Sequence, residues 1–261
     1  MAILQRMMIA LLSVAMLAAG AVNATSTTNF SDQWWNEVES GWGVSVLQQA
    51  DVLFITLGVY GADNKPTWFT GAAFKQSGAT PGHTLFTGDL YQTNGPYHGG
   101  SFNTSSVTYV TVGTLTFDAA TANDATLTYS VDGRWVVKNV TRQLWRYENL
   151  TGKYGGFWHT ECSSGLTQNE PLTLTVTHNA DNSVVGRLDS VDHGVGYYVL
   201  FRGTYSQSGH MGQIVAHMQA PDKGTVTFSE IEWTPFGFVG RVSGDAQGCQ
   251  AVSGRIAAVL Q

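Results

Sequence analysis

Glu37 and Glu39 are the first residues of the chain whose type and spacing could support catalysis. They lie two positions apart, so their side chains would share a face if the segment were extended. A pair of carboxylates is what hydrolysis of a glycosidic bond requires. Neighbouring positions on one strand rarely flank a scissile bond from opposite sides, however, and no other carboxylate has an obvious partner. We therefore favour a structural role for the two glutamates, and no residue is predicted to be catalytic.

The same stretch could instead bind a ligand through its tryptophans. Tryptophan rings stack on sugars, cations and flat apolar ligands, and nearby amides and carboxylates can fix hydroxyl groups. The predicted ligand-binding residues are Trp34, Trp35, Asn36, Glu39, Trp42 and Trp68. The alternative is that the tryptophans plug or line a core, while Glu39 accepts hydrogen bonds from turn amides around Ser40 and Gly41. The two interpretations are compatible, because an aromatic floor can also contact a ligand.

Other catalytic and metal-binding patterns are absent from the sequence. The run from His159 to Cys162 has the His-x-Glu spacing of zinc deaminases, but the Pro-Cys-x-x-Cys that those enzymes require is missing. The other histidines form neither an i, i+2 pair nor a His-Glu-x-x-His pattern, although residues distant in sequence could still converge in space. Gly-x-Ser-x-Gly is also absent, and the glycines fall at strand ends. We predict no metal site and no cofactor.

The first 24 residues have the pattern of a secretory signal peptide. Arg6 precedes an apolar run over residues 7–18, and small residues lead to Val22-Asn23-Ala24. The apolar run is too short to anchor the protein across a bilayer. We expect cleavage after Ala24, export to the periplasm or the medium, and no membrane insertion after cleavage.

Composition narrows the classes of partner. The formal net charge is −6, which argues against nucleic acid and gives no attraction to anionic lipid. Only 12% of the residues are charged, while glycine and aromatic residues are plentiful. This composition is typical of glycine-punctuated antiparallel sheet. The expected partner is a small molecule, a glycan or a protein.

The elements that would position these residues are strands, because apolar and polar residues alternate between turn signals. After the tryptophan run, the first half contains strand patterns over residues 43–49, 51–60, 67–74, 84–91, 108–117, 125–131 and 135–146. Asp132-Gly133 between the last two indicates a hairpin. A meander of about eight strands tends to close, since open edges promote aggregation.

The second half repeats this organisation after a joint at residues 148–153. Its predicted strands cover residues 154–160, 172–178, 183–188, 197–205, 212–218, 225–233, 238–242 and 250–260. Cys162 follows the first of these strands and Cys249 precedes the last. In an exported protein the two are expected to form a disulfide, which favours closure because it places the first and last strands side by side.

We therefore predict an all-β protein of two consecutive antiparallel, up-and-down, eight-stranded barrels. The first domain would cover residues 25–147 and the second residues 154–261. A pair of β-sandwiches is the alternative, because the number of strands does not separate the two architectures.

The first half also carries recognisable motifs: Trp34-Trp35-Asn36, Glu39-Ser40-Gly41-Trp42-Gly43, Pro66-Thr67-Trp68 and Thr141-Arg142-Gln143. On these residues, the region from about residue 32 to 144 resembles a β-rich domain of secreted proteobacterial proteins. The resemblance implies bacterial export and no particular chemistry. The chain departs from the pattern at Glu37, where that family tends to have proline. The second half, with its Phe157-Trp158 start, is similar to avidin-like barrels in style only, and biotin binding is not implied.

Together these features favour an exported, non-enzymatic binding protein that contacts its ligand through an aromatic platform. Two alternatives stay open. One is a hydrolase of an extracellular polymer with Glu37 or Glu39 as acid/base. The other is an inhibitor or interaction domain that uses its strand edges.

Overall fold

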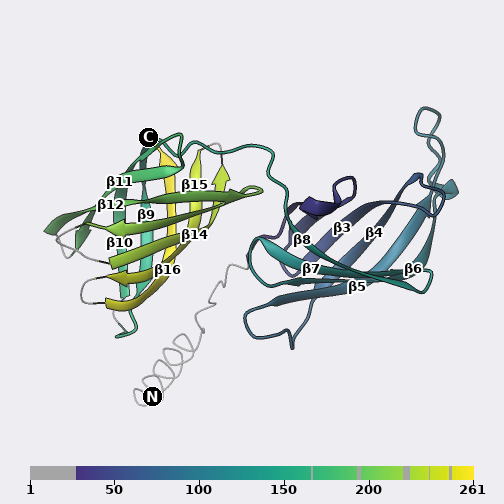
Figure 1. Ribbon diagram of the computed structural model, residues 1–261, viewed down its shortest axis with the longest axis horizontal. Helices are drawn as coiled ribbons and strands as arrows, with labels where there is room; N and C mark the ends of the chain where they lie inside the picture. Colours follow the sequence, from purple (N-terminus) through teal and green to yellow (C-terminus); the bar gives the residue numbers. More distant parts are fainter. Residues whose placement is uncertain (1–27, 166, 193–194, 220–223, 235, 247–248) are drawn as a thin grey trace, which may run out of the picture.

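The protein consists of two closed, eight-stranded antiparallel barrels that follow one another in the chain (Figure 1). The computed structural model describes residues 28–165, 167–192, 195–219, 224–234, 236–246 and 249–261. This confirms the predicted barrels over the alternative of sandwiches. The proposed signal peptide, residues 1–24, lies outside the described residues. Within the described ranges, no helix has the length and apolar character needed to cross a membrane.

The first barrel is a simple meander in which each strand pairs with the next. Its strands are β1 (Asp32–Trp35), β2 (Gly43–Gln49), β3 (Val52–Tyr60), β4 (Pro66–Lys75), β5 (Thr84–Asn94), β6 (Thr108–Ala119), β7 (Asp124–Val131) and β8 (Arg134–Arg142). β1 pairs with β8 and closes the barrel. Two short 3₁₀ helices, η1 (Glu37–Glu39) and η2 (Thr104–Ser106), lie in its connections.

The second barrel repeats the meander. Its strands are β9 (Gly152–Glu161), β10 (Thr167–His178), β11 (Ser183–Asp192), β12 (Val195–Ser208), β13 (Met211–Met218), β14 (Gly224–Thr234), β15 (Gly237–Ala246) and β16 (Cys249–Leu260). β9 pairs with both β10 and β16, so the first and last strands are neighbours, as closure predicted. The side chain of Cys249 lies outside the described residues, and the Cys162–Cys249 disulfide stays a prediction.

Alternation in the sequence explains which side chains fill each barrel. In β3, Leu53, Ile55 and Leu57 are buried while the residues between them face outward. The buried faces of all eight strands in each barrel converge on one apolar core per barrel. In the first core the Trp34 ring packs edge-on against Phe117, with centroids 5.1 Å apart. Each barrel therefore has its own hydrophobic interior.

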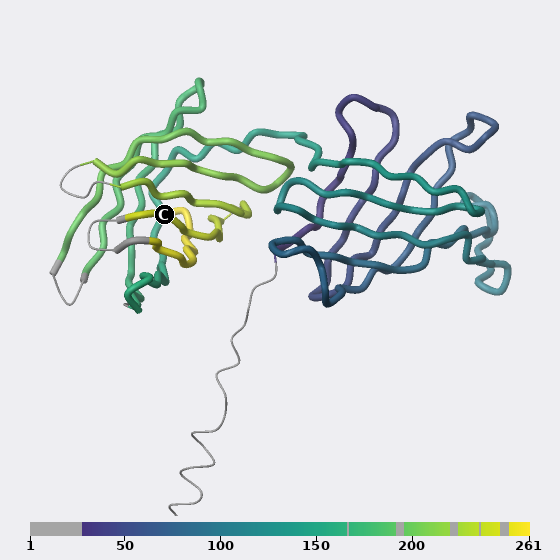
Figure 2. The backbone as a smooth tube through the Cα atoms, turned by 60° about the horizontal axis from the view of Figure 1, so that its bottom comes forward, coloured from purple at the N-terminus to yellow at the C-terminus, as the bar shows by residue number. Residues whose placement is uncertain are grey.

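The predicted strands are present, but several are longer than predicted: β10 begins at Thr167 instead of residue 172, and β15 continues to Ala246 instead of residue 242. The end of the first barrel differs in the other direction. β8 ends at Arg142, whereas the sequence pattern extended the strand to residue 146. Residues 143–151 leave the first barrel and cross to the second, which begins at Gly152 (Figure 2). The predicted Asp132-Gly133 hairpin is confirmed, since both residues have positive φ, 50° and 78°, as a tight two-residue turn requires.

A buried ion pair lies where the two barrels meet. The Arg142 side chain is fully buried, and its Nη1 lies 3.3 Å from Asp32 Oδ2. The same Asp32 oxygen accepts hydrogen bonds from the backbone N–H of His210 (2.9 Å) and from His210 Nδ1 (2.6 Å), in the turn between β12 and β13. Burial lowers the pKa of Arg142 to about 10, so the guanidinium is charged at neutral pH. Burial raises the pKa of Asp32, but hydrogen bonds from His210 and Gln33 outweigh it and the net shift is downward.

Candidate functional site

The motif stretch after β1 turns into a 3₁₀ helix instead of continuing as a strand. Asn36 caps this helix: its Oδ1 accepts from the Val38 N–H at 3.0 Å, and its Nδ2 donates to the Asn139 carbonyl at 3.1 Å. Successive residues of a 3₁₀ helix are rotated by about 120°, so Glu37 and Glu39 do not point the same way. The shared face expected for an extended pair of glutamates is therefore absent.

Glu39 is held by two side chains. Lys138 Nζ on β8 lies 2.7 Å from Oε2 and 2.9 Å from Oε1, and Trp42 Nε1 donates to Oε2 at 3.1 Å. These partners differ from the turn amides around Ser40 and Gly41 that the sequence suggested. The hydrogen bond from Lys138 lowers the pKa of Glu39. A general acid at neutral pH needs a raised carboxyl pKa, so this environment opposes that role.

The two adjacent tryptophans face opposite sides of the barrel wall. Trp34 is fully buried, and its Nε1 donates to the Phe30 carbonyl at 3.0 Å. It therefore cannot contact an external ligand. Trp35 points outward and is half-buried. Trp42 packs partly against the core, and the Lys138 ammonium lies 5.9 Å from the centroid of its ring.

A trough lies on the outer face of β1 to β4. Gly43 pairs with Gly58, and Gly58 pairs with Trp68. Trp34 pairs with Val44, so the next outward position places Trp35 beside Gly43. The outer row across four strands thus reads Trp35, Gly43, Gly58, Trp68, with bare backbone between two tryptophans. The Trp68 side chain is 52% exposed.

A groove of about 510 Å³ follows this row. Trp35, Trp42 and Tyr60 supply its aromatic surface, and Gly43 and Gly58 lie among its lining residues. The neighbouring outward row adds an amide and two hydroxyls, from Gln33, Ser45 and Thr56, which pair with one another in register. Its lining contains no charged side chain. The groove therefore offers stacking surfaces and neutral hydrogen-bonding groups.

The structure brings together only part of the predicted platform. Trp35 and Trp42 line the groove, and Trp68 lies in the same outward row. Trp34 is in the core, Asn36 caps η1, and Glu39 pairs with Lys138. Sequence reasoning missed Tyr60 and Gly58. The sequence did contain a signal for Gly58. Gln49 pairs with Val52 at the hairpin turn, so Gly43, six residues before Gln49, must lie opposite Gly58, six residues after Val52.

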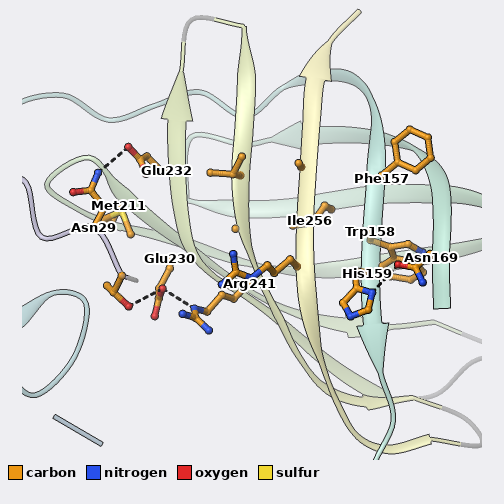
Figure 3. A pocket seen from close by; sticks show the side chains of 15 residues that line it. Asn29, Phe157, Trp158, His159, Asn169, Met211, Glu230, Glu232, Arg241 and Ile256 are labelled. Atoms are coloured by element: carbon orange, nitrogen blue, oxygen red, sulfur yellow. Dashed lines mark hydrogen bonds and ion pairs between the residues drawn. The ribbon is translucent and has the colours of Figure 1, made fainter. Parts of the chain in front are cut away.

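A second cavity, of about 540 Å³, lies where the segment before β1 meets the outer face of the second barrel (Figure 3). Glu230 accepts from Thr28 Oγ1 at 3.1 Å and from Arg241 Nε at 2.7 Å. Glu232 accepts from Asn29 Nδ2 at 3.1 Å. The carboxylates of this cavity thus bind the segment before β1, which gives them a role in joining the barrels.

Among the described residues, no group of three or more histidine, cysteine, aspartate or glutamate side chains is placed to hold a metal ion. His159 instead contacts Asn169 Oδ1 at 2.7 Å, and His83 contacts Asp118 Oδ1 at 2.9 Å.

Comparisons with known proteins give only distant structural likeness. No family model matches the chain, so the resemblance of residues 32–144 to a secreted proteobacterial domain has no family model behind it. No curated protein matches either. Among solved structures, the chain is similar to the isotype 1 transferrin binding protein B from serogroup B Neisseria meningitidis, with 12% identity and a TM-score of 0.32. The match covers 85% of this chain and 52% of that protein, so the chain spans about half of its length.

Proposed function

We propose that the protein is an exported, non-enzymatic binding protein that holds a neutral, polyhydroxylated ligand such as a glycan in the trough on the first barrel. The observation that carries this proposal is the outer row Trp35, Gly43, Gly58, Trp68, in which two tryptophans flank bare backbone. Aromatic faces stack on sugar rings, and the neutral amide and hydroxyls beside the row suit sugar hydroxyl groups. The lack of charge in the lining favours a neutral ligand over an ionic one.

Gly58 supports this proposal because packing does not require a glycine there. A Cβ added at Gly58 would meet only the Gly43 carbonyl oxygen, at 3.8 Å, and φ is in the ordinary range for a strand. Glycine in a strand interior weakens the strand and often marks a close approach by a ligand or another backbone. The main effect of having glycine at position 58 is therefore to leave space in the trough.

The trough can be tested by filling it. We expect Gly58→Val to leave the fold intact and to weaken glycan binding by at least roughly tenfold, because the new side chain occupies the space between the tryptophans. Binding would be measured by tryptophan fluorescence and thermal shift with cellohexaose, chitohexaose and maltohexaose.

Gly196→Val is the matched control, since a Cβ at this strand glycine of the second barrel meets nothing within 4 Å and is thus also free of close contacts. It should bind like the wild type. If none of the three oligosaccharides binds the wild type, or if Gly58→Val binds them equally well, the proposed glycan site is wrong.

The two alternatives have less support. For a hydrolase, the candidate carboxylates are Glu39, which is paired with Lys138, and Glu37, which does not share a face with Glu39 in the 3₁₀ helix. An interaction domain that adds a partner strand needs a free edge. Each named strand of the two barrels already has a neighbour on both sides.

We also propose that residues 1–24 are removed on export, that the mature domains cover residues 25–147 and 154–261, and that Cys162 bonds to Cys249. The adjacency of β9 and β16 supports the disulfide. An intact mass spectrum of the purified periplasmic or secreted protein should show the loss of residues 1–24 and of two hydrogens. The full-length mass, or two thiols that alkylate without reduction, would contradict this proposal.

A further inference from the structure

A further groove, of about 410 Å³, lies on the outer face of β7, β8 and β1, on the other side of Trp35 from the trough. We call it the β7–β8 groove. Trp35 is the residue that it shares with the trough, so the same indole borders both hollows. Its lining also includes the polar residues Asn36, Glu37, Asp124, Thr126, Asn139 and Thr141.

The outward row of the trough continues into this groove. Trp35 pairs with Thr141 on β8, and Thr141 pairs with Asp124 on β7. The row therefore runs over six neighbouring strands, from Asp124 on β7 to Trp68 on β4. Neighbouring strands lie about 4.8 Å apart, so these five steps cover roughly 24 Å of the barrel wall. That length exceeds a single sugar ring and suits a chain of several sugars.

The β7–β8 groove offers the same neutral hydrogen-bonding groups as the trough. Thr126 and Asn139 pair in register and belong to its lining, and the Thr126 hydroxyl donates to Asn139 Oδ1 at 3.3 Å. Two carboxylates, of Glu37 and Asp124, also border the groove. They disfavour an anionic chain such as a polyuronide, because like charges placed together are costly. A neutral sugar chain therefore suits both hollows.

The wall that carries the row is curved, because the first barrel is closed. A straight chain that lies along β1 to β4 would leave the surface beyond Trp35 instead of entering the β7–β8 groove. Maltooligosaccharide chains curve in one direction, whereas cellooligosaccharide chains are straight ribbons. The two grooves can thus be occupied together by a chain of the first kind.

We propose, taking the proposed function as the premise, that the ligand is a neutral, curved oligosaccharide that bends around Trp35 and occupies both the trough and the β7–β8 groove. Sugars on the trough side lie between Trp35 and Trp68, and sugars on the other side contact Thr126 and Asn139. The proposal predicts that affinity increases with chain length and that this gain depends on the curvature of the chain.

The test compares maltohexaose with maltotriose by titration of tryptophan fluorescence. Maltohexaose should bind at least roughly tenfold more tightly, because its additional sugars reach contacts beyond Trp35 that the trisaccharide does not span. Cellohexaose should gain little over cellotriose.

Thr126→Phe fills the β7–β8 groove and should abolish the gain from maltotriose to maltohexaose, without changing the affinity for maltotriose. Thr128→Phe is the matched control: it lies two residues further along β7 on the same outward face and belongs to the lining of neither groove. It should keep the full gain.

Equal affinities for maltohexaose and maltotriose, an equal gain for the cellulose series, or a full gain in Thr126→Phe would each overturn the proposal. The absence of binding by both maltooligosaccharides would also overturn it, whereas the trough itself fails only if cellohexaose and chitohexaose do not bind either. Should Thr126→Phe fail to fold, amide chemical shifts of the wild type decide instead. Saturating maltohexaose should move the signals of Thr126 and Asn139, and signals that do not move refute the second half of the site.

Discussion

Arg142→Met is expected to destabilise the protein by about 3–5 kcal/mol, the cost typical of breaking a buried ion pair from one side. The Arg142 guanidinium donates to the carbonyls of Ala122 and Ser31 at 2.6 and 3.1 Å and lies 3.3 Å from Asp32 Oδ2. It also lies over the Trp34 ring, 4.7 Å from the centroid. Methionine fills much of the same volume, but it leaves Asp32 charged and partly buried without the arginine of its ion pair.

The matched control is Arg146→Met, four residues along the chain. Arg146 is 80% exposed and its contact with Glu148 is 3.5 Å, so its loss should cost less than about 1 kcal/mol. Urea unfolding followed by circular dichroism measures both free energies. Equal costs for the two variants would show that the buried network around Arg142 contributes nothing beyond an ordinary surface pair.

Trp34→Ala is expected to cost about 3–5 kcal/mol, because it removes the largest fully buried side chain of the first core and leaves a cavity. The same change one position later, Trp35→Ala, should cost less than about 1.5 kcal/mol, because that ring faces outward. Trp35→Ala should instead weaken binding in the trough.

Chemical unfolding and the oligosaccharide titration of the wild type, applied to both variants, separate the two effects. A larger loss of stability in Trp35→Ala than in Trp34→Ala would contradict the assignment of their faces.

Much of the architecture could be predicted because it is local. Alternation of apolar residues gave the bounds of β2, and Asp132-Gly133 gave the turn between β7 and β8. Both features depend on residues that are near neighbours in sequence. The end of β8 could not be found this way: the alternation continues beyond Arg142, and the strand stops because the chain leaves for the second barrel. Similarly, the sequence left open whether residues 37–39 were extended, and the cap from Asn36 shows that they form the 3₁₀ helix η1.

The candidate sites depend on contacts that local patterns do not contain. Glu39 meets Lys138 across 99 positions of sequence, and only the closure of the barrel brings them together. The hydrogen bonds of Glu170, a buried carboxylate of β10, could not be predicted from the sequence either, because its partners come from three different strands. The trough could be predicted in part: the sequence identified its tryptophans, but predicting the glycines of its floor required the register of β2 against β3.

The short seam of the first barrel has a consequence for its dynamics. β1 pairs with β8 through two residue pairs, whereas β9 pairs with β16 through eight. Local opening takes the least stable contacts first, so amide hydrogen exchange by sub-global unfolding should begin at this seam. Trp35 lies on β1, and Trp68 lies on β4 at the other side of the trough. Gln143, which follows β8, also lines the groove, so a ligand that contacts both Gln143 and β1 lies across the seam, and its binding energy adds to the protection of the seam amides.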